Sequence, residues 1–227
     1  IAADSRAAPE YIERFSAGSR ALHWSYALPF VALILTGLGM LIPEAKGIAV
    51  GGSRLVPALH IAAGFLLLAG PPLTYFGAAD RGLVHRDAAR IARFGLRDVR
   101  WLAWAGKATI GFQRREPAAG KFNAGQKLNS AFTVATGAAL AATGVALTIH
   151  SVRKGIFDVD LAQRIFTLHG LLAYAAMPVV GVHIYLATVN PGTREALRGI
   201  TKGIVRRDWA SRHHPGWVAD EDGKGLP

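Results

Sequence analysis

The sequence contains no cysteine. A chain without thiols forms no disulfide, holds no iron–sulfur cluster through thiolates and attaches no haem covalently. Any metal bound by this chain must therefore be held by histidine, carboxylate or backbone groups. Any haem it binds must be non-covalent, of the b type.

Charged side chains are scarce, at 18% of the residues, and are missing from four long stretches. The charge-free stretches, each of at least 23 residues, are 21–43, 55–79, 128–152 and 165–193. About 20 apolar residues cross the hydrocarbon core as a helix, whereas a membrane barrel shows short alternating segments. The sequence therefore predicts an all-α membrane protein, a bundle of four transmembrane helices within a single domain over residues 1–227. The helices are expected at about 21–43, 55–79, 128–152 and 163–190.

The remaining segments are polar: tails at 1–20 and 191–227, and a loop at 80–127. Within the loop, residues 87–106 mix arginines with apolar side chains that include Trp101 and Trp104. Such a composition is typical of a helix that lies in the membrane interface. In the second spanning helix, Pro71-Pro72 predicts a kink or a break.

Acidic residues are few, 15 against 26 lysines and arginines, which gives a net charge of +11. The basic residues concentrate in the first tail (three), the 77–127 loop (eleven) and the last tail (seven), and only five lie in the two short connections. This bias predicts that both termini and the long loop are cytoplasmic. Attraction to anionic lipid, such as cardiolipin, explains the charge without any nucleic acid.

His169 and His183 lie fourteen residues apart in the fourth spanning helix. Fourteen steps of 100° bring both imidazoles to nearly the same face, about 21 Å apart along the axis. One helix thus offers a metal ligand near each side of the membrane. This layout favours two stacked metal centres.

The predicted topology pairs these histidines with two others by depth. His23 begins the first helix near the cytoplasmic face, and His183 lies near the same face at the end of the fourth helix, which runs inward. His60 begins the second helix at the outer face, near His169. Each pair can supply both axial ligands of one b haem, which predicts two haems. The alternative is that the four are ordinary buried histidines hydrogen-bonded across helices.

The other histidines are weaker candidates. His150 ends the third helix at the outer face and is a third possible ligand there, although an interface or solvent role is favoured. Solvated positions are expected for His85, His213 and His214. Arg20 shares a helix face with His23 and is positioned for a haem propionate or, equally, for a lipid phosphate. Glycines in the helices permit either close approach of a macrocycle or helix packing.

A polar segment precedes the third spanning helix on the cytoplasmic side. Asn123 and Gln126 offer amide groups, and Gly125 permits close approach of the backbone. Together with His183 they could bind the carbonyl groups of a quinone. Because Asn and Gly are ordinary turn residues, a simple helix cap carries equal weight.

The stretch Gly120-Lys-Phe-Asn-Ala-Gly-Gln-Lys-Leu-Asn129 resembles the signature of the cytochrome b556, or gamma, subunit of bacterial membrane-bound formate dehydrogenases. Arg20-x-x-His23-Trp24, His60 and the fourteen-residue histidine spacing match that family too. The resemblance covers about residues 10–210, and the long amino-terminal lead and the tail with Trp217 depart from it. More broadly, four helices with two b haems are typical of bacterial di-haem cytochromes b, including those of nickel–iron hydrogenases.

The resemblance implies a function and partners. The chain would reside in the bacterial inner membrane and carry electrons from an iron–sulfur subunit to menaquinone or ubiquinone. A separate subunit with a molybdenum or tungsten pterin would oxidise formate, and the complex could form a higher oligomer. The resemblance assigns the same two haem ligand pairs and a quinone site at Asn123, Gly125 and Gln126. The alternatives are a hydrogenase-type or other quinone-reducing cytochrome b and, less favoured, a haem-free anchor or transporter.

Overall fold

A computed structural model describes residues 10–50, 53–112, 116–153 and 155–223. Close backbone contacts divide the chain into two compact units. We call residues 17–81 and 132–183 the spanning unit, and the residues before 17, from 82 to 131 and after 183 the terminal unit. Each unit is described below by itself.

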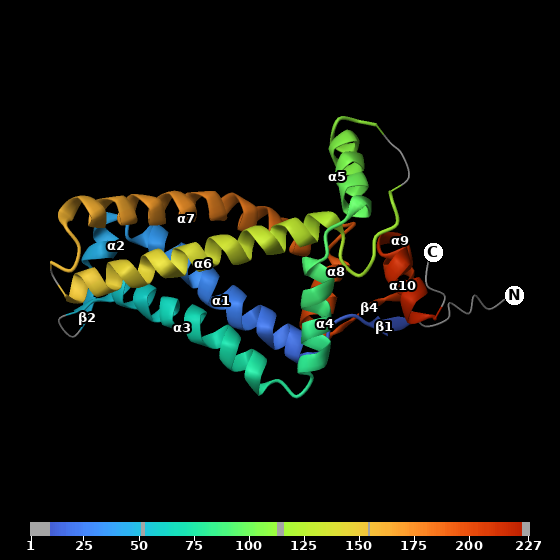
Figure 1. Ribbon diagram of the computed structural model, residues 1–227, viewed down its shortest axis with the longest axis horizontal. Helices are drawn as coiled ribbons and strands as arrows, with labels where there is room; N and C mark the ends of the chain where they lie inside the picture. The colour runs from blue at the N-terminus through green and yellow to red at the C-terminus, as the bar shows by residue number, and fades with distance from the viewer. Residues whose placement is uncertain (1–9, 51–52, 113–115, 154, 224–227) are drawn as a thin grey trace, which may run out of the picture. The chain divides into compact units, whose positions relative to one another are not determined.

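Four long helices dominate the structure: α1 (Ala17–Gly39), α3 (Leu55–Gly77), α6 (Ala124–Val152) and α7 (Val159–Thr188) (Figure 1). All four are long and apolar enough to cross a membrane. They confirm the predicted four-helix membrane bundle. α6 and α7 each begin four residues before the predicted start, because side-chain oxygens accept backbone N–H groups there. Asn123 does so at α6 and Asp158 at α7, where Leu161 is the donor at 2.7 Å.

Proline does not interrupt these helices. Pro29 lies inside α1, Pro178 inside α7, and the pair Pro71-Pro72 inside α3. α3 remains helical through both residues to Gly77, so there is no break there, and the alternative, a kink, stays a prediction. A membrane helix tolerates proline where neighbouring groups satisfy the freed carbonyls.

Within the spanning unit, the backbones of α1 and α3 lie close along much of their length, and no other two spanning helices do so over the described residues. The buried core is small, formed by Phe30, Leu67 and Ala176. At Gly137 of α6, a Cβ would overlap the hydroxyl of Tyr26, which donates to the Thr133 carbonyl at 2.8 Å. Short elements connect α1 to α3: α2 (Pro43–Gly47) and the antiparallel pair β2 (Ala49–Val50) and β3 (Ser53–Arg54).

The predicted interfacial helix over 87–106 is two helices, α4 (Arg81–Ala92) and α5 (Leu96–Thr109). The division falls at Gly95, which caps α5: its N–H donates to the Asp98 carboxylate at 2.9 Å. Phe94 and Leu96 at the junction are exposed. These apolar side chains suit a membrane surface, and the interfacial position stays a prediction.

The described parts of the two polar tails contain regular structure. β1 (Tyr11–Glu13) pairs antiparallel with β4 (Ile204–Arg206), and Ile12 lies opposite Val205. Around this ladder lie α8 (Glu195–Lys202), α9 (Arg207–His213) and α10 (Pro215–Glu221). Their buried core consists of Val205, Trp209, Ala210, Trp217 and Val218. Two tryptophans thus give a mostly polar segment enough apolar area to fold.

Candidate functional site

Four histidines of the spanning unit form two pairs, and they are the pairs that depth predicts. His23 on α1 and His183 on α7 have ring centres 6.3 Å apart, with planes inclined by 52°. His60 on α3 and His169 on α7 have ring centres 6.2 Å apart, inclined by 73°. Over the described residues neither pair shares a direct hydrogen bond. α7 therefore contributes one imidazole to each of two separate sites.

This spacing fits one metal ion between the two rings of each pair. Metal–imidazole bonds of about 2.0–2.1 Å, with about 1.1 Å from each nitrogen to its ring centre, place two axial imidazoles about 6.3 Å apart. Glycine gives room beside the second pair: a Cβ on Gly37 would contact His60 Cε1 at 3.6 Å, and one on Gly144 would contact His169 Cε1 at 3.4 Å. The residues present fit a haem that would be held by the two histidines of each pair.

Two threonines form hydrogen bonds with the second pair, His60 and His169. Thr36 Oγ1 lies 2.9 Å from His60 Nδ1, and Thr143 Oγ1 lies 2.8 Å from His169 Nδ1. These are hydrogen bonds across helices, and the alternative of ordinary buried histidines also predicts such bonds. They engage only Nδ1, however, so the opposite nitrogen, Nε2, remains available to a metal.

An apolar layer lies between the two pairs along the helices. Ala176 lies seven residues from both His169 and His183 on α7, and it packs with Phe30 and Leu67. Partly buried aliphatic and aromatic side chains complete the layer: Tyr26, Leu33, Ile34, Leu140 and Val180. The side chains of this layer carry no charge, so an apolar region lies between the two pairs.

The remaining histidines differ in environment. His85 on α4 is exposed, as expected, and His213 is half-buried. His150 stacks on Phe157, with ring centres 5.8 Å apart. His214 is almost fully buried, at 2% exposure, so its predicted solvated position is wrong. The tryptophans on both sides of it in the sequence, Trp209 and Trp217, were the available indication of a core there.

The predicted quinone residues form a helix cap in the terminal unit. Gln126 N–H donates to Asn123 Oδ1 at 2.9 Å, and Asn123 N–H donates to Gln126 Oε1 at 3.0 Å. This reciprocal pair is a capping box at the start of α6. A Cβ on Gly125 would contact the indole ring of Trp101 at 3.3 Å, so this glycine lies under an aromatic ring. The cap does not test quinone binding, which stays a prediction.

Lysines on both sides of this cap connect it to α4 and α5. Lys121 Nζ donates to Asp87 at 2.5 Å, and Lys127 Nζ donates to Asp98 at 2.9 Å and to the Arg93 carbonyl at 2.8 Å. Burial lowers the pKa of Lys121, and its hydrogen bond to Asp87 opposes this shift. Two largely buried ion pairs therefore fix the loop before α6 and the first turn of this helix.

Arg14 occupies the centre of the terminal unit, at 2% exposure. Its guanidinium lies 5.2–5.5 Å from three ring centres, those of Phe15, Trp209 and Trp217. It donates to the Lys121 carbonyl at 2.9 Å and to His214 Nε2 at 3.1 Å, while His214 Nδ1 donates to the Gly120 carbonyl at 2.8 Å. Burial lowers the pKa of Arg14 to about 10.

Burial, followed by the nearby charge of Arg14, lowers the pKa of His214 to about 3. The histidine is therefore neutral at physiological pH and can accept the arginine's hydrogen bond. No sequence pattern indicates this contact, because 200 positions separate the two residues.

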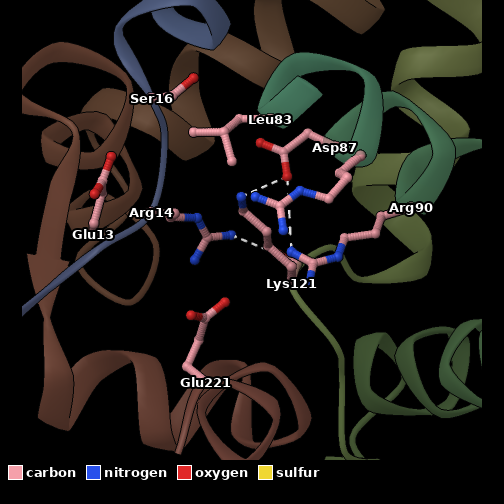
Figure 2. A pocket seen from close by; sticks show the side chains of 9 residues that line it. Glu13, Arg14, Ser16, Leu83, Asp87, Arg90, Lys121 and Glu221 are labelled. Atoms are coloured by element: carbon pink, nitrogen blue, oxygen red, sulfur yellow. Dashed lines mark hydrogen bonds and ion pairs between the residues drawn. The ribbon is translucent and has the colours of Figure 1, made fainter. Parts of the chain in front are cut away.

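A cavity of about 230 Å³ lies beside Arg14. Figure 2 shows Arg14, Lys121, Asp87 and Glu221 around it. Four cationic and three carboxylate side chains line it, together with Ser16 and Leu83: Arg14, Arg86, Arg90 and Lys121 against Glu13, Asp87 and Glu221. The charges nearly balance, which suits a hydrated junction between polar segments better than a site for an ion of one sign.

Arg20 lies half-buried in the first turns of α1. Its expected contact with a haem propionate is not tested by the structure and stays a prediction.

Comparison with known proteins gives a consistent group of similar proteins. A family model described as prokaryotic cytochrome b561 matches residues 14–203. The chain is 27% identical to the formate dehydrogenase cytochrome b556(fdo) subunit of Escherichia coli strain K12, over 92% of each chain. It is 25% identical to the formate dehydrogenase cytochrome b556 subunit of Haemophilus influenzae, over 92% of this chain and 83% of that one. The family match ends at Gly203, before β4, α9 and α10.

Proposed function

Since the chain belongs to the prokaryotic cytochrome b561 family and is a membrane cytochrome b electron-transfer subunit, we propose that it serves a formate dehydrogenase complex. In this proposal it anchors the complex in the inner membrane and reduces quinone, and it does not itself oxidise formate. Its relatives named as formate dehydrogenase cytochrome b556 subunits support this assignment.

The observation that supports the proposal is the presence of two histidine pairs, each of which includes one imidazole from α7. The ring centres of His60 and His169 lie 6.2 Å apart and those of His23 and His183 lie 6.3 Å apart, a spacing that would suit one metal ion held by each pair. Haem b bound there supplies one-electron exchange at its iron. The protein orients the ligands, separates the sites by about 21 Å of helix and places an apolar layer between them.

The proposed path begins at an iron–sulfur subunit on the periplasmic side, which receives electrons from a subunit with a molybdenum or tungsten pterin. His60 and His169 would hold the haem on the electron-entry side, and His23 and His183 would hold the haem beside the proposed quinone site. Both haems would supply one-electron exchange between the iron–sulfur subunit and menaquinone or ubiquinone. The quinone site is proposed at Asn123, Gly125 and Gln126 on the basis of the motif, with His183 added because the predicted topology puts it at the same membrane face. If quinol takes its protons from the cytoplasm, the path builds a membrane potential.

The proposal is tested by haem stoichiometry. The purified complex is expected to contain two b haems per chain by pyridine haemochrome analysis. His60→Ala or His183→Ala should each lower the ratio to one, because a single imidazole remains at that site. His85→Ala, at an exposed position, is the control and should keep two. A wild-type ratio near one, or two haems in both variants, would contradict the assigned pairs.

The same sample identifies the electron donor. The family description is broader than formate dehydrogenase, so a nickel–iron hydrogenase or another quinone-reducing complex is the alternative. A co-purifying molybdenum or tungsten pterin subunit supports the proposal, and a nickel–iron partner supports the alternative. A chain without a b-type optical spectrum would indicate the haem-free anchor or transporter. Binding of cardiolipin and a higher oligomer remain predictions.

A further inference from the structure

The two histidine sites differ in what supports their ligands. At one site, both imidazoles bond to a threonine: His60 to Thr36 at 2.9 Å and His169 to Thr143 at 2.8 Å. The two threonines come from different helices, α1 and α6. Over the described part of the chain, neither His23 nor His183 makes a hydrogen bond of this kind.

The direction of these bonds follows from the single proton of a hydroxyl group. Thr36 Oγ1 lies 2.7 Å from the Ala32 carbonyl, and Thr143 Oγ1 lies 2.8 Å from the Ala139 carbonyl. A carbonyl oxygen only accepts, so each hydroxyl donates its proton to the preceding turn of its helix. Each threonine must then accept from the imidazole Nδ1–H. This fixes the tautomer in which Nε2 is free to bind a metal.

Donation from Nδ1–H also changes the electronic character of the ligand. It makes the imidazole a stronger base and so favours the more highly charged, oxidised metal. Two such bonds at one site and none at the other create a difference between the sites. The His60/His169 site should therefore have the lower reduction potential.

Resting on the proposed function, we propose that Thr36 and Thr143 are positioning residues that lower the potential of the His60/His169 haem relative to the His23/His183 haem. Electrons entering at His60/His169 then move to a site of higher potential. The two hydroxyls thereby favour transfer in the direction of the proposed quinone site.

The test is a spectroscopic redox titration of the purified complex. Thr36→Val and Thr143→Val remove the hydroxyl with little change of volume. Each should raise the midpoint potential of one haem. The expected rise is up to about 59 mV, which corresponds to a tenfold change in the reduction equilibrium of a one-electron couple. The other haem should not shift, and the double variant should shift further. His183→Ala, with a single haem left, identifies which haem moves.

Three further variants separate the electronic effect from packing. Thr36→Ser keeps the hydroxyl and should keep the wild-type potential, whereas Thr36→Ala should show the same rise as the valine variant. Thr148→Val is the matched control, because Thr148 donates to the Gly144 carbonyl at 2.8 Å on the same helix as Thr143. If Thr36→Val and Thr143→Val keep two haems and show unchanged potentials, this inference alone is overturned. Equal shifts of both haems, or a matching shift in Thr148→Val, would overturn it as well. A wild-type complex without two haems would instead overturn the proposed function.

Discussion

At the scale of single residues, the contact between Arg14 and His214 joins the beginning and the end of the chain. Both side chains are almost fully buried. A desolvated cation is costly unless partners compensate, and here three aromatic rings and two hydrogen-bond acceptors surround it. His214 can accept from Arg14 only while it is neutral. Its protonation would place two cations side by side in the core.

This arrangement predicts acid sensitivity of the terminal unit. The folded-state pKa of His214, about 3, lies below the ordinary value of 6.5, so the stability that its neutral form contributes is complete above pH 6.5. That stability is lost as the pH falls from 6.5 toward 3, by up to about 1.4 kcal/mol per pH unit. Limited proteolysis of the carboxy-terminal segment in the purified complex, from pH 8 to pH 4, should show increasing cleavage.

His214→Gln removes the titrating group but keeps a polar side chain. It should cost about 1–3 kcal/mol at neutral pH and flatten the acid dependence. His85→Gln, at an exposed position, should leave the profile unchanged. An equally steep acid profile in His214→Gln would show that other groups cause the sensitivity.

At the scale of elements, the start of α6 combines a helix cap with the predicted quinone motif. Asn123 and Gln126 satisfy each other's backbone N–H groups. Lys121 and Lys127 bind Asp87 of α4 and Asp98 of α5. The motif is therefore rigid, as a binding site requires, but the cap alone could explain its residue types.

Conservative variants separate the two roles. Asn123→Ser and Gln126→Glu retain a capping oxygen but lose an amide donor. If the amides bind quinone, both variants should lower formate-dependent quinone reduction by about tenfold or more while the haem content stays normal, since one lost hydrogen bond is worth about 1.4 kcal/mol in binding or the transition state. Asn123→Ala, which also loses the cap, should in addition destabilise α6 by about 1 kcal/mol. Wild-type rates of quinone reduction in Asn123→Ser and Gln126→Glu would show that these two residues act only as a helix cap.

At the scale of the whole molecule, the four spanning helices and the charge bias together predict a topology with both termini in the cytoplasm. The absence of cysteine makes this directly testable, because a single introduced thiol is then the only one in the chain. Leu96 on α5 and Val159 at the start of α7 are both well exposed, at 78% and 83%. The predicted topology puts them on opposite sides of the membrane.

Labelling of single-cysteine variants in intact spheroplasts should distinguish the two sides. Val159→Cys should react with a membrane-impermeant maleimide, whereas Leu96→Cys should react only after lysis. The cysteine-free chain is the control for background. Labelling of Leu96→Cys in intact spheroplasts would reverse the predicted orientation.

Much of the spanning unit follows from the sequence alone. Four charge-free runs longer than a bilayer core require helices, because lipid offers no partner to an open backbone. The fourteen-residue interval between His169 and His183 sets their common face and their separation by helix geometry. The pairs with His23 and His60 then follow from helix direction, and the structure brings both pairs to about 6 Å.

Tertiary structure decided what depends on contacts between residues distant in sequence. Nothing local indicates that Thr36 would meet His60 or that Thr143 would meet His169, since each lies 24 to 26 positions away on another helix. The folded tails, the burial of His214 and the pairing of β1 with β4 likewise depend on apolar area gathered from both ends of the chain. Periodicity and charge determine which segments enter the membrane and which face carries the ligands. Only packing determines which side chain forms a hydrogen bond with each histidine ligand, because that contact has no fixed spacing along the chain.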